Sequence, residues 1–282
     1  MSRGNLPVVA AVPNYNMAHS LGELLPRLAE QDYAAIFVLD DASTDESREV
    51  VSDFDKNINF VAGTENVGAG ANRNRIVNAL GFNAIIHFVD ADMHLETERV
   101  PELAQEIASS ATVGFVGGLI KEADGKQHPF NYGPRQCLRA DIGANLQTYI
   151  AGKIESDPER AAKLRDRFYR FVADFPDLLA EPKARRIFWN AEANLLIRSD
   201  VLADIGGFDP TLRDHEIQDL AIRLADAGLE RRFDPALSAL HKAVIVRSGN
   251  RNLQMMKAEW QIARKHGLLN WLLPDGKFQP VL

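Results

Sequence analysis

Residues 34–55 read AAIFVLDDASTDESREVVSDFD, and this segment indicates the fold class. It opens with an apolar run, Ala34–Asp40, which ends in an aspartate; Asp41 and a polar, helix-forming segment follow. A short, almost wholly apolar run with a helix directly after it is typical of a parallel β-α unit. Ser43 precedes Glu46 by three residues, which is the spacing of a reciprocal N-terminal cap. We therefore expect Ser43 to cap a helix over about Thr44–Asp55.

The same alternation of strand and helix extends on both sides of this segment. We expect further strands at Pro7–Val12, Ala84–Asp90 and Thr112–Ile120. Amphipathic segments lie between the strands, at Ser20–Glu30, Gly68–Leu80 and Thr97–Ser109. Apolar strands separated by helices predict an α/β fold with a doubly wound, mostly parallel sheet flanked by helices.

The second half of the chain has a different pattern. From Lys121 to about residue 190 it is charged and mostly helical, which predicts a helical insert. A strand-like run returns at Ala193–Arg198, and we expect a tight turn at Gly206-Gly207. The remaining expected elements are a helix at Glu216–Ala227, a strand near Ala236–His241 and a last helix from about Leu253 to Lys265.

Composition excludes several classes of protein. The 32 Lys and Arg residues against 39 Asp and Glu give a net charge of −7, which argues against a nucleic-acid partner. The single cysteine, Cys137, excludes an intramolecular disulfide and a cysteine metal cluster. No apolar run reaches the roughly 20 residues that cross a bilayer, and the start does not read as a signal peptide, so we expect a cytoplasmic protein. Gly267–Leu273 predicts at most peripheral membrane contact, with a docked terminal helix as the alternative.

The turns after the strands are where ligands bind in an open α/β sheet. The first turn, Pro13–His19, has no glycine, which argues against a dinucleotide or P-loop site. If Ser43 caps the next helix, the pair Asp40-Asp41 holds a carboxylate that the structure does not need, and it could accept a hydrogen bond from a base or a ribose.

Asp90 and Asp92 follow the predicted strand at Ala84–Asp90, and side-chain alternation puts them on the same side. Two converging carboxylates repel unless a cation lies between them, so Mg²⁺ or Mn²⁺ bridging to substrate phosphates is one interpretation. A solvated pair of turn aspartates is the other.

The order of these motifs resembles an inverting family 2 glycosyltransferase of GT-A fold. The resemblance covers about residues 7–248, and the insert matches nothing in it. It rests on Val12-Pro-Asn-Tyr-Asn16, Asp40–Asp45, Asn66-Val-Gly68 with Arg73-Asn74, Asp90-Ala-Asp92, Asn194–Arg198, Gly206-Gly-Phe-Asp209, Glu216 with Asp219-Leu220 and Arg223-Leu224, and His241.

The resemblance implies a role for each matching residue. Pro13 would shape the first turn, Tyr15 and Asp41 would hold the nucleobase, and Arg73 would lie near the donor phosphates. Asp90 would address ribose and metal, with Asp92 and His241 completing the metal site. It also implies residues 1–120 as a nucleotide-sugar-binding half, 121–190 as a candidate acceptor lid and 191–282 as an acceptor and catalytic half, all within one integrated GT-A domain.

The general base is where the sequence departs from the family. The resemblance implies an acidic pair at the start of the helix at Glu216–Ala227, but Ile217 takes the second position. We expect Glu216 to act as the base, with Asp219 as substitute and Asp214 as a weaker candidate. The alternative is structural: Glu216 favours the helix dipole, and Asp219 pairs with Arg223 four residues on.

The sequence therefore predicts a metal-dependent glycosyltransferase that moves a sugar from a nucleotide-diphosphate donor, with UDP favoured and guanosine open. The acceptor would be a hydroxyl on a glycan, lipid or small molecule. Two alternatives remain: a catalytically silent homologue, and a sugar-phosphate nucleotidyltransferase.

Overall fold

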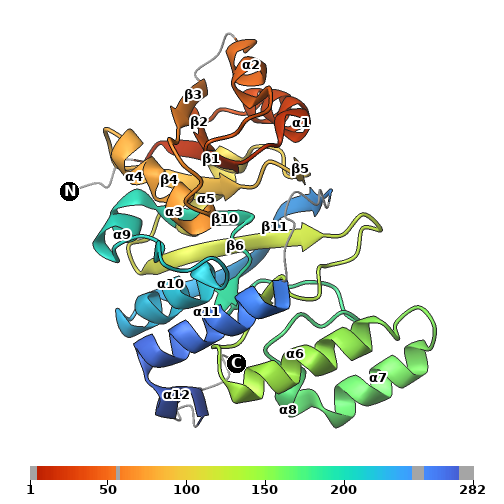
Figure 1. Cartoon of the computed structure of the whole chain (residues 1–282). Helices are drawn as coiled ribbons and strands as arrows, with labels where there is room; N and C mark the ends of the chain where they lie inside the picture. Colours follow the sequence, from red (N-terminus) through yellow and green to blue (C-terminus); the bar gives the residue numbers. More distant parts are fainter. Residues whose placement is uncertain (1–4, 55–57, 243–250, 273–282) are drawn as a thin grey trace.

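The computed structural model describes residues 5–54, 58–242 and 251–272. Within these residues nine strands form one sheet, in the order β3-β2-β1-β4-β10-β6-β11-β5, and β8 pairs with β11 at the side. Figure 1 shows the sheet running through the middle of the molecule, with α1 and α2 at one end and the insert helices α6, α7 and α8 at the other. β7 (Tyr132–Gly133) and β9 (Trp189–Asn190) form a second, two-stranded sheet, and Asn190 contacts Gly118 of the main sheet.

The first four strands of the sheet are parallel, as expected from their apolar sequences. They are β1 (Val8–Asn14), β2 (Ala35–Asp40), β3 (Ile58–Ala62) and β4 (Ile85–Val89). β10 (Asn194–Arg198) then inserts antiparallel between β4 and β6 (Val113–Lys121). β11 (Glu230–His241) runs parallel to β6, and it pairs antiparallel with β5 (Met93–Leu95) and with β8 (Arg185–Arg186).

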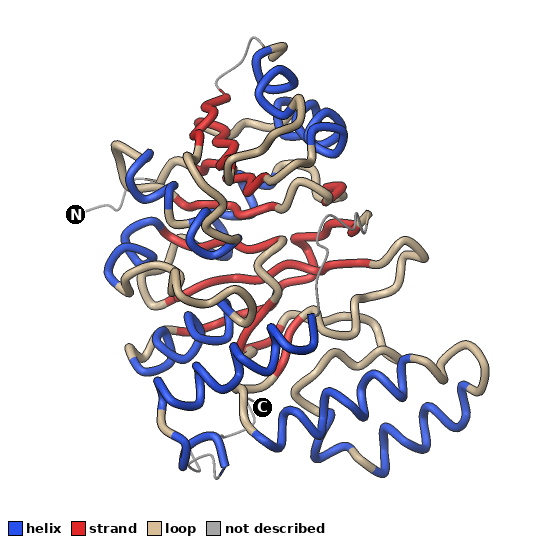
Figure 2. The backbone as a smooth tube through the Cα atoms, in the orientation of Figure 1, coloured by secondary structure: helices blue, strands red, loops and turns tan. Residues whose placement is uncertain are grey.

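Helices cover both faces of this sheet (Figure 2). Two apolar clusters of side chains fill most of the interior, and both draw on β1, β2 and β4. The helices are α1 (Ala18–Ala29), α2 (Ser47–Ser52), α3 (Ala69–Arg73), α4 (Arg75–Ala79), α5 (Val100–Ala108), α6 (Leu138–Ala151), α7 (Pro158–Arg167), α8 (Tyr169–Val172), α9 (Ser199–Asp204), α10 (Glu216–Asp226), α11 (Arg251–His266) and α12 (Leu268–Leu272).

The expected mostly parallel α/β sheet is confirmed, and the boundaries of several elements differ. The segment Gly68–Leu80 forms two short helices, and the strand expected near Ala236 is the end of the longer β11. The tight turn at Gly206-Gly207 is confirmed. Gly207 has φ +69, and a Cβ there would come within 2.4 Å of Asn74 Oδ1, so the turn needs glycine at this position.

The expected cap at Ser43 is wrong. Ser43 Oγ instead accepts hydrogen bonds from Asn16 N, at 2.8 Å, and from Asn14 Nδ2, at 3.1 Å, and so ties the second turn to the first. Asp45 serves the start of α2, because its carboxylate accepts from the backbone N–H of Ser47 at 3.2 Å. The hydroxyl of Ser43 therefore accepts hydrogen bonds from the neighbouring turn, and these bonds compete with capping of the following helix.

In the C-terminal region α12 follows α11 directly, and the side chains of Leu268, Leu269 and Leu272 are exposed. Among the residues that the structure describes, no helix has both the length and the apolar character needed to cross a bilayer. Peripheral membrane contact of this segment stays a prediction.

Candidate active site

The first two strand ends form a tightly bonded pair of turns. Asp40 accepts a hydrogen bond from Asn14 Nδ2 at 2.8 Å and from Ser43 N at 3.0 Å. Asp41 accepts from the backbone N–H groups of Val67 and Gly68, both at 2.9 Å. Neither carboxylate is surplus to the structure, so the expectation that the pair Asp40-Asp41 holds a carboxylate without a structural role is wrong. Tyr15 stands 39% exposed on the rim of these turns, beside the half-buried Pro13.

The turn between β4 and β5 meets the end of β11 at Asp92 and His241. β11 pairs with β5 so that His241 lies opposite Met93, the residue after Asp92. As a result His241 Nε2 lies 3.2 Å from Asp92 Oδ2, although the two residues are 149 positions apart. The hydrogen bond to Asp92 is the main reason why the pKa of His241 is raised above its ordinary value.

Arg73 is the centre of a buried charge cluster. Its guanidinium is 2% exposed and contacts two carboxylates, Asp90 Oδ1 at 2.6 Å and Glu192 Oε1 at 3.3 Å. Burial disfavours its charge, but the two carboxylates outweigh this and raise the pKa of Arg73 above its ordinary value. Because its two terminal nitrogens bind Asp90 and Glu192, Arg73 holds these two carboxylates together in this structure.

Glu216 opens α10 next to this cluster and is only 5% exposed. Burial, together with the negative charge of Glu192, raises the pKa of Glu216 to about 7. A carboxyl group with this pKa is available in both protonation states near neutral pH, as a general base or acid must be. Ile217, in the position where a second acid was expected, is 3% exposed and packs in the core.

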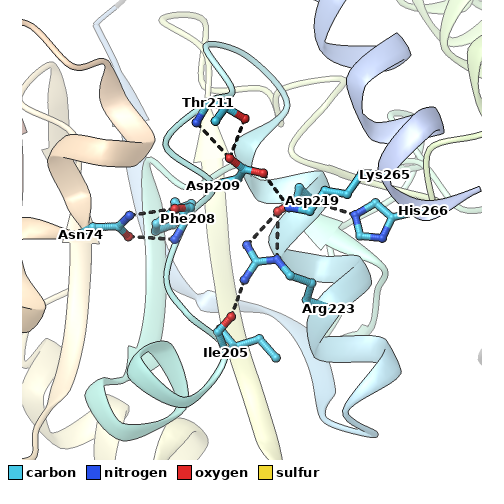
Figure 3. Close-up of polar contacts among 9 residues, drawn as sticks. All are labelled: Asn74, Ile205, Phe208, Asp209, Thr211, Asp219, Arg223, Lys265 and His266. Carbon is cyan, nitrogen blue, oxygen red and sulfur yellow. Dashed lines mark hydrogen bonds and ion pairs between the residues drawn. The ribbon is translucent and has the colours of Figure 1, made fainter.

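Asp219 lies in a buried network of ion pairs and hydrogen bonds. Its carboxylate is fully buried and is contacted by His266 Nε2 at 2.7 Å, Lys265 Nζ at 2.8 Å and Arg223 Nη2 at 2.8 Å (Figure 3). Burial alone would raise its pKa, but the hydrogen bonds from His266 and Lys265 and the charge of Arg223 hold that pKa well below its ordinary value. A carboxylate held by Arg223, Lys265 and a hydrogen bond to His266 is a poor base, and its pairing with Arg223 matches the structural alternative.

The residues expected at a metal site fit a cation whose ligands come partly from the protein and partly from a bound substrate. Asp92 and His241 offer one carboxylate oxygen and one imidazole nitrogen side by side. Within the described part of the chain, no three His, Cys, Asp or Glu side chains form a group that could hold a metal ion by themselves. Oxygen ligands from a diphosphate would complete the coordination that Mg²⁺ or Mn²⁺ prefers.

The structure thus brings Arg73, Asp90 and Glu216 into one cluster, and it joins Asp92 to His241. Asp219 lies outside this cluster, in a separate group of ion pairs. Glu192 was missed by the sequence reasoning. It lies in an irregular link before β10, and its partner Arg73 is 119 residues away, so only the pairing of β10 with β4 reveals it.

Comparison with known proteins identifies the family. Residues 10–153, just over half of the chain, match the family described as Glycosyl transferase family 2. The chain is 24% identical over 249 residues to the N-acetylglucosaminyl-diphospho-decaprenol L-rhamnosyltransferase of Mycobacterium tuberculosis, covering 84% of this chain and 75% of that protein.

Solved structures with the same fold include S. aureus TarS 1-349 in complex with UDP-GlcNAc. The TM-score is 0.60, with 17% identity, 96% of this chain and 69% of that chain covered. The mannosyltransferase PcManGT from Pyrobaculum calidifontis, in complex with GDP-Man and Mn²⁺, has a TM-score of 0.58, with 18% identity, 94% of this chain and 65% of that chain covered. With the sheet and the strand-end residues described above, these matches show that the chain belongs to glycosyltransferase family 2 and is a glycosyltransferase of GT-A fold.

Proposed function

We propose that the chain transfers a sugar from a nucleotide-diphosphate donor, with UDP-sugars favoured, to an acceptor hydroxyl with inversion, in a reaction that requires Mn²⁺ or Mg²⁺. One observation carries this proposal: Asp92 and His241 meet at 3.2 Å beside the buried cluster of Arg73 and Glu216. The solved relatives support a nucleotide-sugar donor, since they contain UDP-GlcNAc and GDP-Man with Mn²⁺.

On the donor side, Tyr15 and Asp41 would contact the nucleobase at the rim of the first two turns, with Pro13 shaping the first. Arg73 contacts Oδ1 of Asp90, and the other carboxylate oxygen of Asp90 would address the ribose or the cation. Asp92 and His241 would hold the cation. When bound, the cation neutralises the charge that develops on the departing diphosphate.

On the acceptor side, Glu216 in its ionised form would take the proton of the acceptor hydroxyl while that oxygen attacks the anomeric carbon. A single displacement of this kind inverts the configuration at that carbon. General-base assistance of this type contributes roughly 10²–10⁴ in rate. The curated relative acts on a decaprenol-linked diphosphate sugar, which supports a glycan or lipid-linked acceptor.

Calorimetric titration with UDP and with GDP, in the presence and absence of Mn²⁺, tests the donor side. We expect one nucleotide to bind with an affinity that depends on Mn²⁺, and Asp92→Ala to remove that dependence. Nucleotide affinity that is the same with and without the metal would contradict the proposed site.

Ile217 stands where a second acid was expected, so turnover is best measured independently of the acceptor. We expect slow hydrolysis of the donor in the absence of acceptor, with release of the nucleotide diphosphate. Glu216→Gln should lose this release while it still binds the nucleotide-sugar.

A further inference from the structure

Glu192 lies against Arg73 and close to Asp90 because of how two strands meet. β10 begins where β4 ends, since the two strands are antiparallel neighbours. Asp90 N donates a hydrogen bond to Ala193 O at 3.1 Å. Glu192 directly precedes Ala193, so this bond brings Glu192 close to Asp90. Arg73 joins the two carboxylates through its two terminal nitrogens.

The Glu216 side chain is confined on another side by α3. A Cβ added to Gly70 would come within 2.8 Å of Glu216 Cγ and 3.3 Å of Phe208 Cβ. Gly70 and Arg73 are three residues apart and therefore lie on the same side of this helix. The glycine makes room for Glu216, and the arginine lies over the Phe208 ring, 5.9 Å from its centroid.

We propose that Glu192 is a positioning residue for sugar transfer: it holds Arg73 in place and supplies, next to Glu216, the second carboxylate that α10 lacks at Ile217. This inference rests on the proposed function, because it assigns Glu192 a task in the same site. Glu192 acts through Arg73 and through its charge. Its side chain is 21% exposed, so it remains in contact with solvent.

The charges around Glu216 come from several elements. They are Glu192 before β10, Arg73 on α3 and, in the loop that leads into α10, Asp214 and His215. Asp90 reaches the group through Arg73. Glu192 is the carboxylate with the largest influence on Glu216. Without it, Arg73 and His215 would face Glu216 with less opposing charge, and its ionised form would be favoured at lower pH.

The test is the pH dependence of kcat/KM for Glu192→Gln, with Glu106→Gln as a matched control at an exposed position on α5. In the unmodified enzyme we expect activity to rise with pH through an apparent pKa near 7. In Glu192→Gln this limb should move to lower pH by about half a unit or more, while the affinity for the nucleotide stays unchanged. Glu106→Gln should leave this pH dependence unchanged.

Glu192→Asp keeps the negative charge, but its side chain is one methylene shorter, which moves the carboxylate away from Arg73. We expect its kcat/KM to rise over the same pH range as in the unmodified enzyme, with a reduced kcat. An unshifted limb in a folded Glu192→Gln enzyme would overturn the proposal, and so would a Glu192→Asp enzyme with unchanged kcat, even if the glutamine variant does not fold. An unmodified enzyme with no limb near pH 7 would instead count against Glu216 as the base, which is a failure of the proposed function.

Discussion

Glu216 combines a cost to the fold with a property that catalysis can use. Its carboxyl group is 5% exposed and has a pKa of about 7, against an ordinary value of 4.5. The unfolded chain loses this proton at lower pH than the folded chain does. Folded stability therefore falls as pH rises from about 4.5 to 7, and the loss persists above that. The same shift places the group where a base works best at neutral pH.

Replacing this carboxyl group by an amide should separate the two effects. Glu216→Gln is expected to lower kcat by about 10²–10⁴. It is also expected to raise the free energy of unfolding at pH 8 by about 1–3 kcal/mol, because no buried charge has to form. The gain should shrink toward pH 4.5. Nucleotide release assays and urea unfolding at pH 5 and pH 8 check both effects. A variant with full turnover would place the base elsewhere.

Gly70 provides a second test of the position of Glu216. In an exposed helix, Gly→Ala stabilises by about 1 kcal/mol, but here the new methyl group would collide with Glu216 Cγ. We expect Gly70→Ala to reduce kcat by roughly 10²-fold through displacement of Glu216, with little change in nucleotide affinity. Gly22→Ala is the control, because its methyl group would meet only Val50 Cγ1, at 4.0 Å. Calorimetry and turnover measurements on both variants check this, and unchanged turnover in Gly70→Ala would show that the site can absorb the methyl group.

Among the elements, the sequence predicted those that carry a strong pattern. β1, β2, β4 and β6 are continuous apolar runs, and each lies within a residue or two of its expected position. β3 is half exposed at the edge of the sheet, and its pattern was too weak to predict it. The antiparallel insertion of β10 between β4 and β6 follows from tertiary pairing, which no local pattern contains. For the same reason Asp92 and His241 were placed together only through the family resemblance, and Glu192 was not found at all.

One buried carboxylate helps to hold α11 on α10, beside the apolar packing of Ile222 against Ala258 and Ile262. Asp219 on α10 receives Lys265 and His266 from the end of α11, and Lys265 also contacts Asp209 at 2.6 Å (Figure 3). Asp219→Asn would remove the buried charge that pairs with Arg223 and Lys265 and that His266 contacts, so we expect a loss of about 3–5 kcal/mol in the free energy of unfolding. Asp226→Asn, at the exposed end of the same helix, should stay within about 0.5 kcal/mol. Urea unfolding at pH 7 compares the two variants.

The pH dependence gives an independent check on this attachment. Since the pKa of Asp219 is lowered in the folded state, its contribution is present at neutral pH and is lost as pH falls below the ordinary value of 3.8. The difference in stability between the unmodified protein and Asp219→Asn should therefore narrow in acid. A difference that is constant from pH 7 to pH 3 would mean that the charge of Asp219 does not hold α11 in place.

In the molecule as a whole, the candidate site joins distant parts of the chain. The sheet takes strands from residues 8–121 and from residues 185–241, and β10 lies between strands of the first group. Asp90 and Asp92 come from the first part, whereas Glu192, Glu216 and His241 come from the second. A nucleotide and a cation bound here would contact both parts at once, so binding should stabilise the entire fold.

Thermal unfolding tests this coupling. With nucleotide at about 100 times its Kd and saturating Mn²⁺, the folded state should gain about 2.7 kcal/mol, which is a rise of roughly 5 °C in Tm for a chain of this size. The rise should be absent in His241→Ala, which loses one candidate ligand of the cation but keeps the cluster around Arg73. Mn²⁺ alone should have a much smaller effect, because Asp92 and His241 supply only part of its coordination. An equal rise in the unmodified protein and in His241→Ala would mean that the nucleotide binds without the cation held between the two parts of the chain.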